Sequence, residues 1–314
     1  MEAEMKLEGI HHITAITADA PGNVEFYAGL LGLRLVKKTV NQDDPTVYHL
    51  FYADEHGSPG SDLTFFEYPH AAPGRAGAGM VHRVIWRVGS SQALDFWEQR
   101  LNGRALALER TPSGLLFQDP EGLAHELVLD TSQEPRLLAD SPEVPSEFAL
   151  AGFDGARAYT SDRAASENLL AQTLNFEDGQ DGRWRVAGLT RSSCYAFDPP
   201  PEAPPIQGAG TVHHIAFASP MDDHEGWQRR IADAGAHPTP VIDRFYFRSI
   251  YFREPSGVLF EIASIGPGFA ADEDSEHLGE RLSLPPRFEP LRARLQEALT
   301  PLPNPRLPAG EHAS

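Results

Sequence analysis

The chain has 314 residues and a formal net charge of −19, with hydrophobic residues at 41% and charged residues at 23%. This length and composition are typical of a globular protein of about two ordinary domains. The negative charge argues against binding to a nucleic-acid backbone or to an anionic membrane surface, because both require a cationic face.

The sequence carries no sign of export or membrane insertion. The N-terminal segment MEAEMKLEGI lacks the basic and apolar parts of a signal peptide, and no stretch approaches the roughly twenty apolar residues that span a bilayer. Cys194 is the only cysteine, so neither an intrachain disulfide nor a thiolate metal cluster is expected. We therefore expect a cytoplasmic protein.

The first part of the chain predicts the element order β, α, β, β, β. The segment LEGIHHITAIT, at 7–17, is rich in β-branched residues and predicts a strand. A helix is expected to begin near Asp19 and Pro21 and to end at Gly32. Three further strands are expected in LRLVKKTVN, TVYHLFYAD and DLTFFEYP, which are separated by Asp, Pro and Gly turn residues.

The same order recurs in the next two units. The second unit opens at Val81 and has an expected helix at 91–101 and strands in RALALERT, GLLFQD and AHELVLD. A linker rich in Pro and Glu follows at 132–147. The third unit opens with GARAYTSD and continues with a helix at 163–174 and strands in WRVAGL and SCYAFD.

A fourth unit follows a Pro-rich loop at 199–205. It opens with TVHHIAFASP and has an expected helix at 222–234 and strands at 245–253 and 258–263. Two matches support repetition: IHHITAIT against VHHIAFAS, and DPEGLAHELV against EPSGVLFEIA. Each matched segment occupies the same place in its unit, which indicates an internal repeat.

The last part of the chain, 271–314, is acidic and rich in Pro. It contains one short amphipathic helix, PLRARLQEAL, with Leu291, Leu295 and Leu299 spaced to lie on one face. We expect this helix to pack on the surface or to form an interface.

The four units together resemble a known superfamily. A βαβββ series in which His opens the first strands and Glu lies in the final strand is similar to the vicinal oxygen chelate superfamily, also called the glyoxalase and type I extradiol dioxygenase group. More narrowly, the chain resembles ring-cleaving dioxygenases that act on hydroquinones. The segments that carry the resemblance are IHHIT, VHHIAF and DRFYFRSIYFREPSGVLFEIA, and the likeness runs through most of the first 270 residues.

The resemblance implies an α+β fold in which four βαβββ modules form two glyoxalase-like domains with curved mixed sheets. The domains expected on this basis are 1–147, with modules one and two, and 148–270, with modules three and four, followed by a tail at 271–314. It also implies that the first module pairs with the fourth and the second with the third, so that the two ends of the chain build one site.

A metal site is expected from two His-His pairs and one Glu. Because neighbouring residues of a strand face opposite sides, only one ring of each pair is expected to point inward. Taken singly, each pair is better explained as a strand start with satisfied polar groups. The resemblance makes His12, His214 and Glu261 the ligands. Two imidazoles and one carboxylate on one face of Fe(II), or of Mn(II) as an alternative, leave positions open for substrate and dioxygen.

The resemblance also implies a substrate pocket around this set. Arg244 and Tyr251 match positions that line it, and His11, His213 and Thr14 join them. Arg244 is expected to stabilise developing negative charge, and the two histidines are candidates for acid and base catalysis. Four aromatic residues are expected either to wall the pocket or to fill the sheet core: Phe245, Tyr246, Phe247 and Phe252.

Two positions separate a dioxygenase from a glyoxalase-type isomerase, which holds its metal with two His and two Glu. Thr64 occupies the position of the second Glu, and Glu67 is expected on the opposite face of its strand. In the second and third modules Arg83 stands where His would be, so Glu126 lacks fellow ligands and no metal is expected there.

The function expected on these grounds is that of an Fe(II)-dependent ring-cleaving dioxygenase that inserts both atoms of O2 into a hydroquinone or related dihydroxylated aromatic compound. The alternatives are a glyoxalase-like lyase or isomerase, and a protein that binds quinones without catalysis. The expected partners are a small aromatic substrate and O2, without nucleic acid or membrane, in a homo-oligomer of two or more chains. Ring substituents, the native metal and the acid and base residues stay open.

Overall fold

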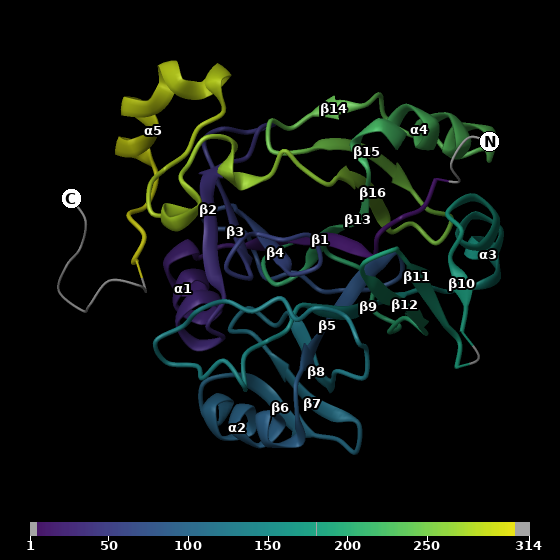
Figure 1. Cartoon of the computed structure of the whole chain (residues 1–314), viewed down its shortest axis with the longest axis horizontal. Coiled ribbons are helices and arrows are strands. Elements are labelled where there is room, and N and C mark those ends of the chain that lie inside the picture. The colour runs from purple at the N-terminus through teal and green to yellow at the C-terminus, as the bar shows by residue number, and fades with distance from the viewer. Residues whose placement is uncertain (1–4, 180, 305–314) are drawn as a thin grey trace.

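The computed structural model describes residues 5–179 and 181–304, and two eight-stranded sheets form most of it (Figure 1). In the first sheet the strands lie in the order β14, β15, β16, β13, β1, β4, β3, β2. In the second the order is β10, β11, β12, β9, β5, β8, β7, β6. The prediction of an α+β fold with mixed sheets is therefore confirmed.

Each sheet combines two modules that are far apart in the chain. The strands of the first sheet are β1 (Ile10–Thr17), β2 (Arg34–Val40), β3 (Tyr48–Ala53), β4 (Asp62–Glu67), β13 (Val212–Ser219), β14 (Ile242–Asp243), β15 (Arg248–Arg253) and β16 (Leu259–Ser264). Those of the second are β5 (Met80–Val88), β6 (Leu106–Arg110), β7 (Gly114–Gln118), β8 (Ala124–Leu129), β9 (Phe153–Tyr159), β10 (Glu177–Asp178), β11 (Arg183–Ala187) and β12 (Ser192–Asp198). The pairing of the first module with the fourth, and of the second with the third, is confirmed. The division of the chain at residues 147 and 270 stays a prediction.

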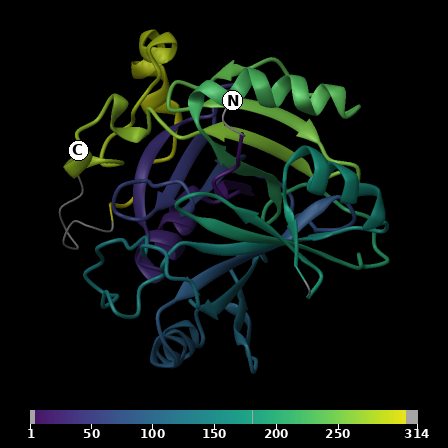
Figure 2. The ribbon, with the colours of Figure 1, turned by 45° about the vertical axis from the view of Figure 1, so that its right-hand side comes forward.

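Helices cross between strands in all four modules. They are α1 (Ala20–Val24), which continues as a π-helical turn at Glu25–Leu30, α2 (Ser91–Leu101), α3 (Ala164–Asn168), which continues as a π-helical turn at Leu169–Thr173, and α4 (His224–Asp233). Figure 2 shows α4 along the outside of β15 and β16. Among the described residues, every helix is too short or too polar to cross a membrane.

The antiparallel pairing of β1 with β13 joins the first and fourth modules and contains two β-bulges. His12 pairs with Ala216 and Thr14 with His214, and the register shifts at His11 on β1 and at His213 on β13. Each bulge inserts one unpaired residue and re-aims its side chain. The first residue of each His-His pair is the inserted one.

These bulges overturn the expectation of strict alternation. Both rings of the first pair contact Phe247, with ring centroids 5.4 Å from His11 and 5.2 Å from His12. Both histidines are buried. The expectation that only one ring of a pair points inward is therefore wrong for His11 and His12, because the bulge interrupts the two-residue period of the strand.

The C-terminal segment packs against β2 and closes one end of the first sheet (Figure 1). Three short 3₁₀ turns follow β16: Phe269–Ala271, Ser275–His277 and Pro286–Leu291. A fourth, Met221–Asp223, directly precedes α4. The short amphipathic helix is confirmed as α5 (Arg292–Ala298), and Leu295 and Leu299 are buried. Placing Leu291 on the same buried face was wrong, since it ends a 3₁₀ turn of different period and is 37% exposed.

A buried lysine ties this segment to the sheet. The Nζ atom of Lys37 donates to the carbonyl oxygen of Phe269 at 2.9 Å and to Asp272 at 2.8 Å, and it also pairs with the buried carboxylate of Glu273. The same ammonium lies 4.8 Å from the ring centre of Tyr246. Lys37 therefore links the tail to residues beside the pocket described below.

We expect Lys37→Met to lower the free energy of unfolding by about 3–5 kcal/mol, because it removes the cation and leaves the Glu273 carboxylate buried. Urea denaturation followed by circular dichroism measures this. The control is Glu289→Ala, which breaks a surface ion pair with Arg292 and should change stability little. Equal effects of the two substitutions would contradict a structural role for Lys37.

Candidate metal centre

Three buried side chains from three strands converge at the centre of the first sheet. The Nε2 atoms of His12 on β1 and His214 on β13 are 3.2 Å apart. The Oε2 atom of Glu261 on β16 lies 3.2 Å from His12 Nε2 and 2.9 Å from His214 Nε2. His12 and His214, which are 202 residues apart in sequence, thus meet each other and Glu261 in space.

The spacing of these atoms suits one metal ion. Two ligands at right angles, each about 2.1 Å from an ion, lie about 3 Å apart, which is close to the three separations observed. Neither carboxylate oxygen of Glu261 accepts a hydrogen bond from a described residue. Burial by itself raises the pKa of Glu261, but the imidazoles of His12 and His214 outweigh it and hold that pKa well below its usual range. Glu261 is therefore a buried carboxylate whose neighbours are two imidazole nitrogens at distances that suit fellow ligands of one ion.

Each of these imidazoles is backed by the preceding histidine. The Nδ1 atoms of His11 and His12 are 2.9 Å apart, and those of His213 and His214 are 2.8 Å apart. The ring planes in each pair stand nearly perpendicular, at 85° and 82°. In both pairs the Nε2 atom of the second histidine is left to face Glu261.

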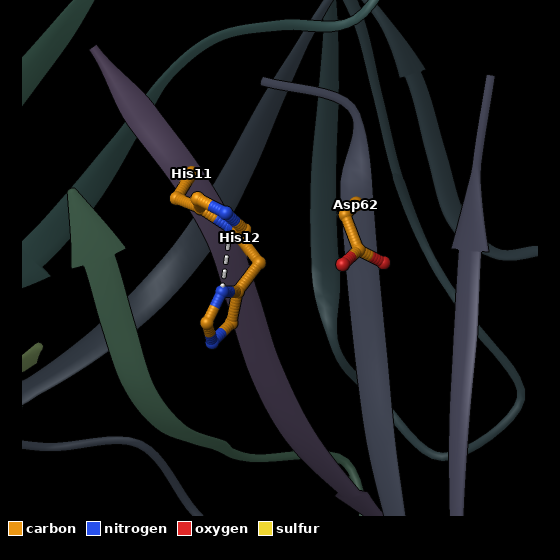
Figure 3. Close-up of side chains that lie close together, drawn as sticks. All are labelled: His11, His12 and Asp62. Atoms are coloured by element: carbon orange, nitrogen blue, oxygen red, sulfur yellow. Dashed lines mark hydrogen bonds between the residues drawn. The ribbon is translucent and has the colours of Figure 1, made fainter. Parts of the chain in front are cut away.

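A second group, composed of His11, His12 and Asp62, also brings nitrogen and oxygen atoms within 4.8 Å of one another (Figure 3). Asp62 lies on β4 directly beside His12 in the parallel ladder. Neither of its carboxyl oxygens has a hydrogen-bond partner among the described residues, and burial raises its pKa well above the usual value. The group shares His12 with the first set, and the close His11–His12 contact in it has the length of a hydrogen bond.

A pocket of about 430 Å³, part of it open to solvent, leads to His12 and His214. Its other lining residues come from the first and fourth modules: Thr39, Asn41, Gln42, Asp43, His49, Phe51, Phe66, Arg244, Tyr246, Phe247 and Tyr251. Arg244 and Tyr251 thus line this pocket, and their role toward a substrate stays a prediction. His11, His213 and Thr14 are not among the lining residues of this pocket.

Arg244 is held at the pocket by two neighbours. Its guanidinium makes two hydrogen bonds of 3.0 Å to the carboxylate of Asp43 and lies 5.4 Å from the ring centre of Tyr251. The hydrogen bonds lower the pKa of Asp43. The ring of Tyr251 stands edge to face with that of His214, with centroids 5.7 Å apart.

Thr64 is part of a chain of hydroxyl and imidazole groups beside the metal-binding set. It donates to Thr14 at 2.8 Å, and His49 Nε2 lies 2.9 Å from its hydroxyl. Thr64 therefore brings no carboxylate to the site. Glu67 accepts a hydrogen bond from the backbone of Ala20, at the start of α1, so it lies on the other side of the sheet, as expected.

The second sheet repeats the scaffold without these ligands. The positions that correspond by register to His12, His214 and Glu261 hold, in that order, Arg83, Gly155 and Ala196. Arg83 donates to Glu126 at 3.1 Å. A guanidinium thus occupies the place in which a metal ion would neutralise Glu126.

Sequence reasoning missed His49, Asp43 and Phe66. His49 and Phe66 pair directly across β3 and β4. Phe66 lies two residues after Thr64 on β4, so both His49 and Phe66 are expected on the face of the sheet that carries Thr64. Asp43 lies in an irregular loop, and no pattern in the sequence points to it. Among the four aromatic residues, Tyr246 and Phe247 line the pocket, whereas Phe252 lies in the hydrophobic core and Phe245 packs against Tyr246.

Comparisons with known proteins agree with this architecture. A family model described as the glyoxalase/bleomycin resistance protein/dioxygenase superfamily matches residues 9–127 and 153–262. MhqO of Bacillus subtilis strain 168, provisionally described as a ring-cleaving dioxygenase, is 42% identical over 305 residues, which cover 94% of this chain and 97% of MhqO. The chlorohydroquinone/hydroquinone 1,2-dioxygenase of Sphingobium indicum is 32% identical over 316 residues, covering 94% of this chain and 97% of that enzyme.

Solved structures have the same fold. A Bacillus subtilis protein provisionally described as a dioxygenase superposes with a TM-score of 0.87 at 39% identity, covering 96% of this chain and 99% of that one. Glyoxalase I of Zea mays superposes with a TM-score of 0.55 at 13% identity, covering 82% and 92%. The second likeness shows the shared fold alone.

We expect His12→Ala, His214→Ala and Glu261→Ala each to weaken Mn(II) or Co(II) binding by more than about 100-fold, beyond the range typical of residues behind a ligand. Anaerobic equilibrium dialysis with metal analysis measures this. The matched control is His49→Ala, which removes a pocket imidazole outside the converging set and should retain the metal. Retention of metal by Glu261→Ala would show that the ligands are others.

Proposed function

The chain belongs to the glyoxalase/bleomycin resistance protein/dioxygenase superfamily, and on that basis we propose that it is an Fe(II)-dependent dioxygenase that opens the ring of a hydroquinone or related dihydroxylated aromatic compound. Both atoms of O2 enter the product. The enzyme class, a ring-cleaving dioxygenase, is that of the relatives that match nearly the whole chain. The hydroquinone substrate is suggested by the printed activity of the Sphingobium enzyme.

The observation that carries the proposal is the convergence of three donors, two imidazoles and one carboxylate, with Thr64 beside them instead of a second carboxylate. Such a set leaves coordination positions free on one side of an ion. When bound there, Fe(II) supplies the redox chemistry that allows O2 to react with an electron-rich ring. Mn(II) suits the same ligands.

The pocket walls suit a flat aromatic substrate. Phe51, Phe66, Tyr246 and Phe247 contribute apolar ring surface around the approach to His12. Burial of an aromatic ring between such side chains is favourable, and stacked or edge-on contacts add to it. We propose that these residues hold the substrate ring, while polar groups at the pocket orient its hydroxyls.

We propose that three polar residues of the pocket act on the substrate. Arg244 carries a fixed positive charge, so it stabilises negative charge that develops on a substrate oxygen. Burial raises the pKa of Tyr251, so this phenol stays protonated and can donate a hydrogen bond to a substrate oxygen. Burial lowers the pKa of His49 well below its usual value, so its imidazole stays neutral and can exchange hydrogen bonds with a substrate hydroxyl.

The isomerase alternative is less well supported. It needs a second carboxylate at the metal, and neither Thr64 nor Glu67, which lies on the other side of the sheet, provides one. A protein that binds quinones without catalysis has no need of a redox-capable ligand set. The homo-oligomer and the cytoplasmic location stay predictions.

Oxygen consumption tests the proposal. We expect anaerobically purified, iron-loaded protein to take up O2 with hydroquinone or methylhydroquinone in an oxygen electrode, and to lose this activity when o-phenanthroline removes the iron. Glu261→Ala serves as the inactive control. No O2 uptake by the iron-loaded protein with these compounds or with catechol would sink the proposal.

Replacing Arg244 by Met should lower kcat/KM for hydroquinone by roughly 100- to 1000-fold, the usual effect of losing one group that stabilises developing charge. Iron content should be unchanged, because Arg244 is outside the converging set. The matched variant is Asp43→Asn, which removes the outer partner of Arg244 but keeps the cation, and we expect it to retain most activity. Steady-state kinetics with metal analysis of each variant separates these effects.

A further inference from the structure

We propose that His11 and His213 are positioning residues, each of which accepts a hydrogen bond from the Nδ1–H group of the following histidine and so fixes the tautomer and ring orientation of a metal ligand. The inference rests on the proposed function only in requiring a metal at His12, His214 and Glu261. It gives the first histidine of each pair a role behind the metal rather than at the substrate.

The tautomers follow from the geometry of the first pair. His12 directs Nε2 at the converging set, so a metal there requires a lone pair on that atom. A neutral imidazole carries one N–H, which must then be on Nδ1. The nearest acceptor is Nδ1 of His11, 2.9 Å away. His11 must therefore hold its own proton on Nε2, since two N–H groups facing each other at this distance would repel.

The second pair repeats this arrangement. His214 directs Nε2 at Glu261 at 2.9 Å, and its Nδ1 lies 2.8 Å from Nδ1 of His213. In both pairs the first histidine is the inserted residue of a β-bulge. The bulge brings two consecutive rings to the same region, which regular alternation would prevent.

The second sheet contains the same bulges without the ligands. Its inserted residues are His82 on β5 and Asp154 on β9. The His82 ring lies 2.8 Å from Asp198, and Asp154 accepts from Arg87 at 3.3 Å. All four bulges thus carry a polar residue, which is a property of the scaffold. Among them, only His11 and His213 contact the imidazole of the next residue in the chain. His82 is therefore a matched control.

The two backing histidines differ in their access to water. His11 is 5% exposed, and its ring lies near the backbone of Ser264, on the strand that carries Glu261. His213 is exposed and lines a separate groove of about 670 Å³ together with Gln207 and Arg253. Water can replace His213 as an acceptor, whereas loss of His11 leaves a buried N–H without a partner.

A second metal ion held by His11, His12 and Asp62 is the competing interpretation (Figure 3). It would make His12 a bridge between two ions. To bridge two ions, His12 would have to lose its remaining N–H proton, because a neutral imidazole has a free lone pair on only one ring nitrogen. The separation between the two Nδ1 atoms is 2.9 Å. It lies within the normal range for a hydrogen bond. The two interpretations differ in the number of ions bound per chain.

The test is anaerobic titration of the metal-free protein with Co(II), followed by its visible absorption. The wild type should bind one equivalent. His11→Leu should bind Co(II) 10- to 100-fold more weakly, as is typical when the partner behind a ligand histidine is lost. His11→Asn, which has a similar size and places an oxygen near the position of Nδ1, should restore most of the affinity. His213→Leu should show a smaller loss than His11→Leu, and His82→Leu should match the wild type.

Unchanged Co(II) affinity in His11→Leu would overturn the inference, and so would two equivalents of Co(II) in the wild type. Thermal unfolding of each metal-free variant checks the fold, and His11→Met replaces His11→Leu as the variant without an acceptor if the latter does not fold. The titration involves neither O2 nor substrate. A wild type that binds Co(II) in this pattern but consumes no O2 with iron would refute the dioxygenase proposal and leave this inference standing.

Discussion

The antiparallel contact between β1 and β13 is the interaction on which the site depends. It places His12 opposite Ala216 and Thr14 opposite His214, so the two imidazoles sit on one face. The parallel pairing of β13 with β16 sets Glu261 beside Ala216 and thereby beside His12. A shift of one residue in either ladder would turn a ligand to the opposite face of the sheet. A metal site in this sheet therefore requires the observed register between β1 and β13, two strands about two hundred residues apart in sequence.

The two sheets differ in how the negative charge of their carboxylates is balanced. In the second, Arg83 meets Glu126, and Arg157 makes two hydrogen bonds to Asp198. In the first, Glu261 is surrounded by imidazoles and is not paired with any described lysine or arginine. An isolated buried carboxylate is costly. The fold can thus supply a cation from its own side chains, and at Glu261 it does not.

The order of elements and the candidate ligands could be predicted from the sequence, whereas the details of the site could not. The His-His pairs and the strand carrying Glu261 stand out because they repeat at equivalent places in different modules. The bulges at His11 and His213 are relations between two strands, and neither strand shows them by itself. Asp43 and Lys37 depend on which loop reaches the pocket and on how the tail folds back, and local propensity contains neither fact.

The C-terminal segment connects the remote packing to the pocket. Lys37 and Tyr246 share the carboxylate of Asp272, since Nζ donates to one oxygen at 2.8 Å and the phenol donates to the other at 3.0 Å. Tyr246 and Phe247 line the pocket, and Phe247 packs on both His11 and His12. Close-packed interiors transmit displacement because they have few voids. The tail residues Phe269 and Leu278 belong to the same buried cluster as Tyr246 and Phe247, so the tail supports the pocket wall that contacts the first His-His pair.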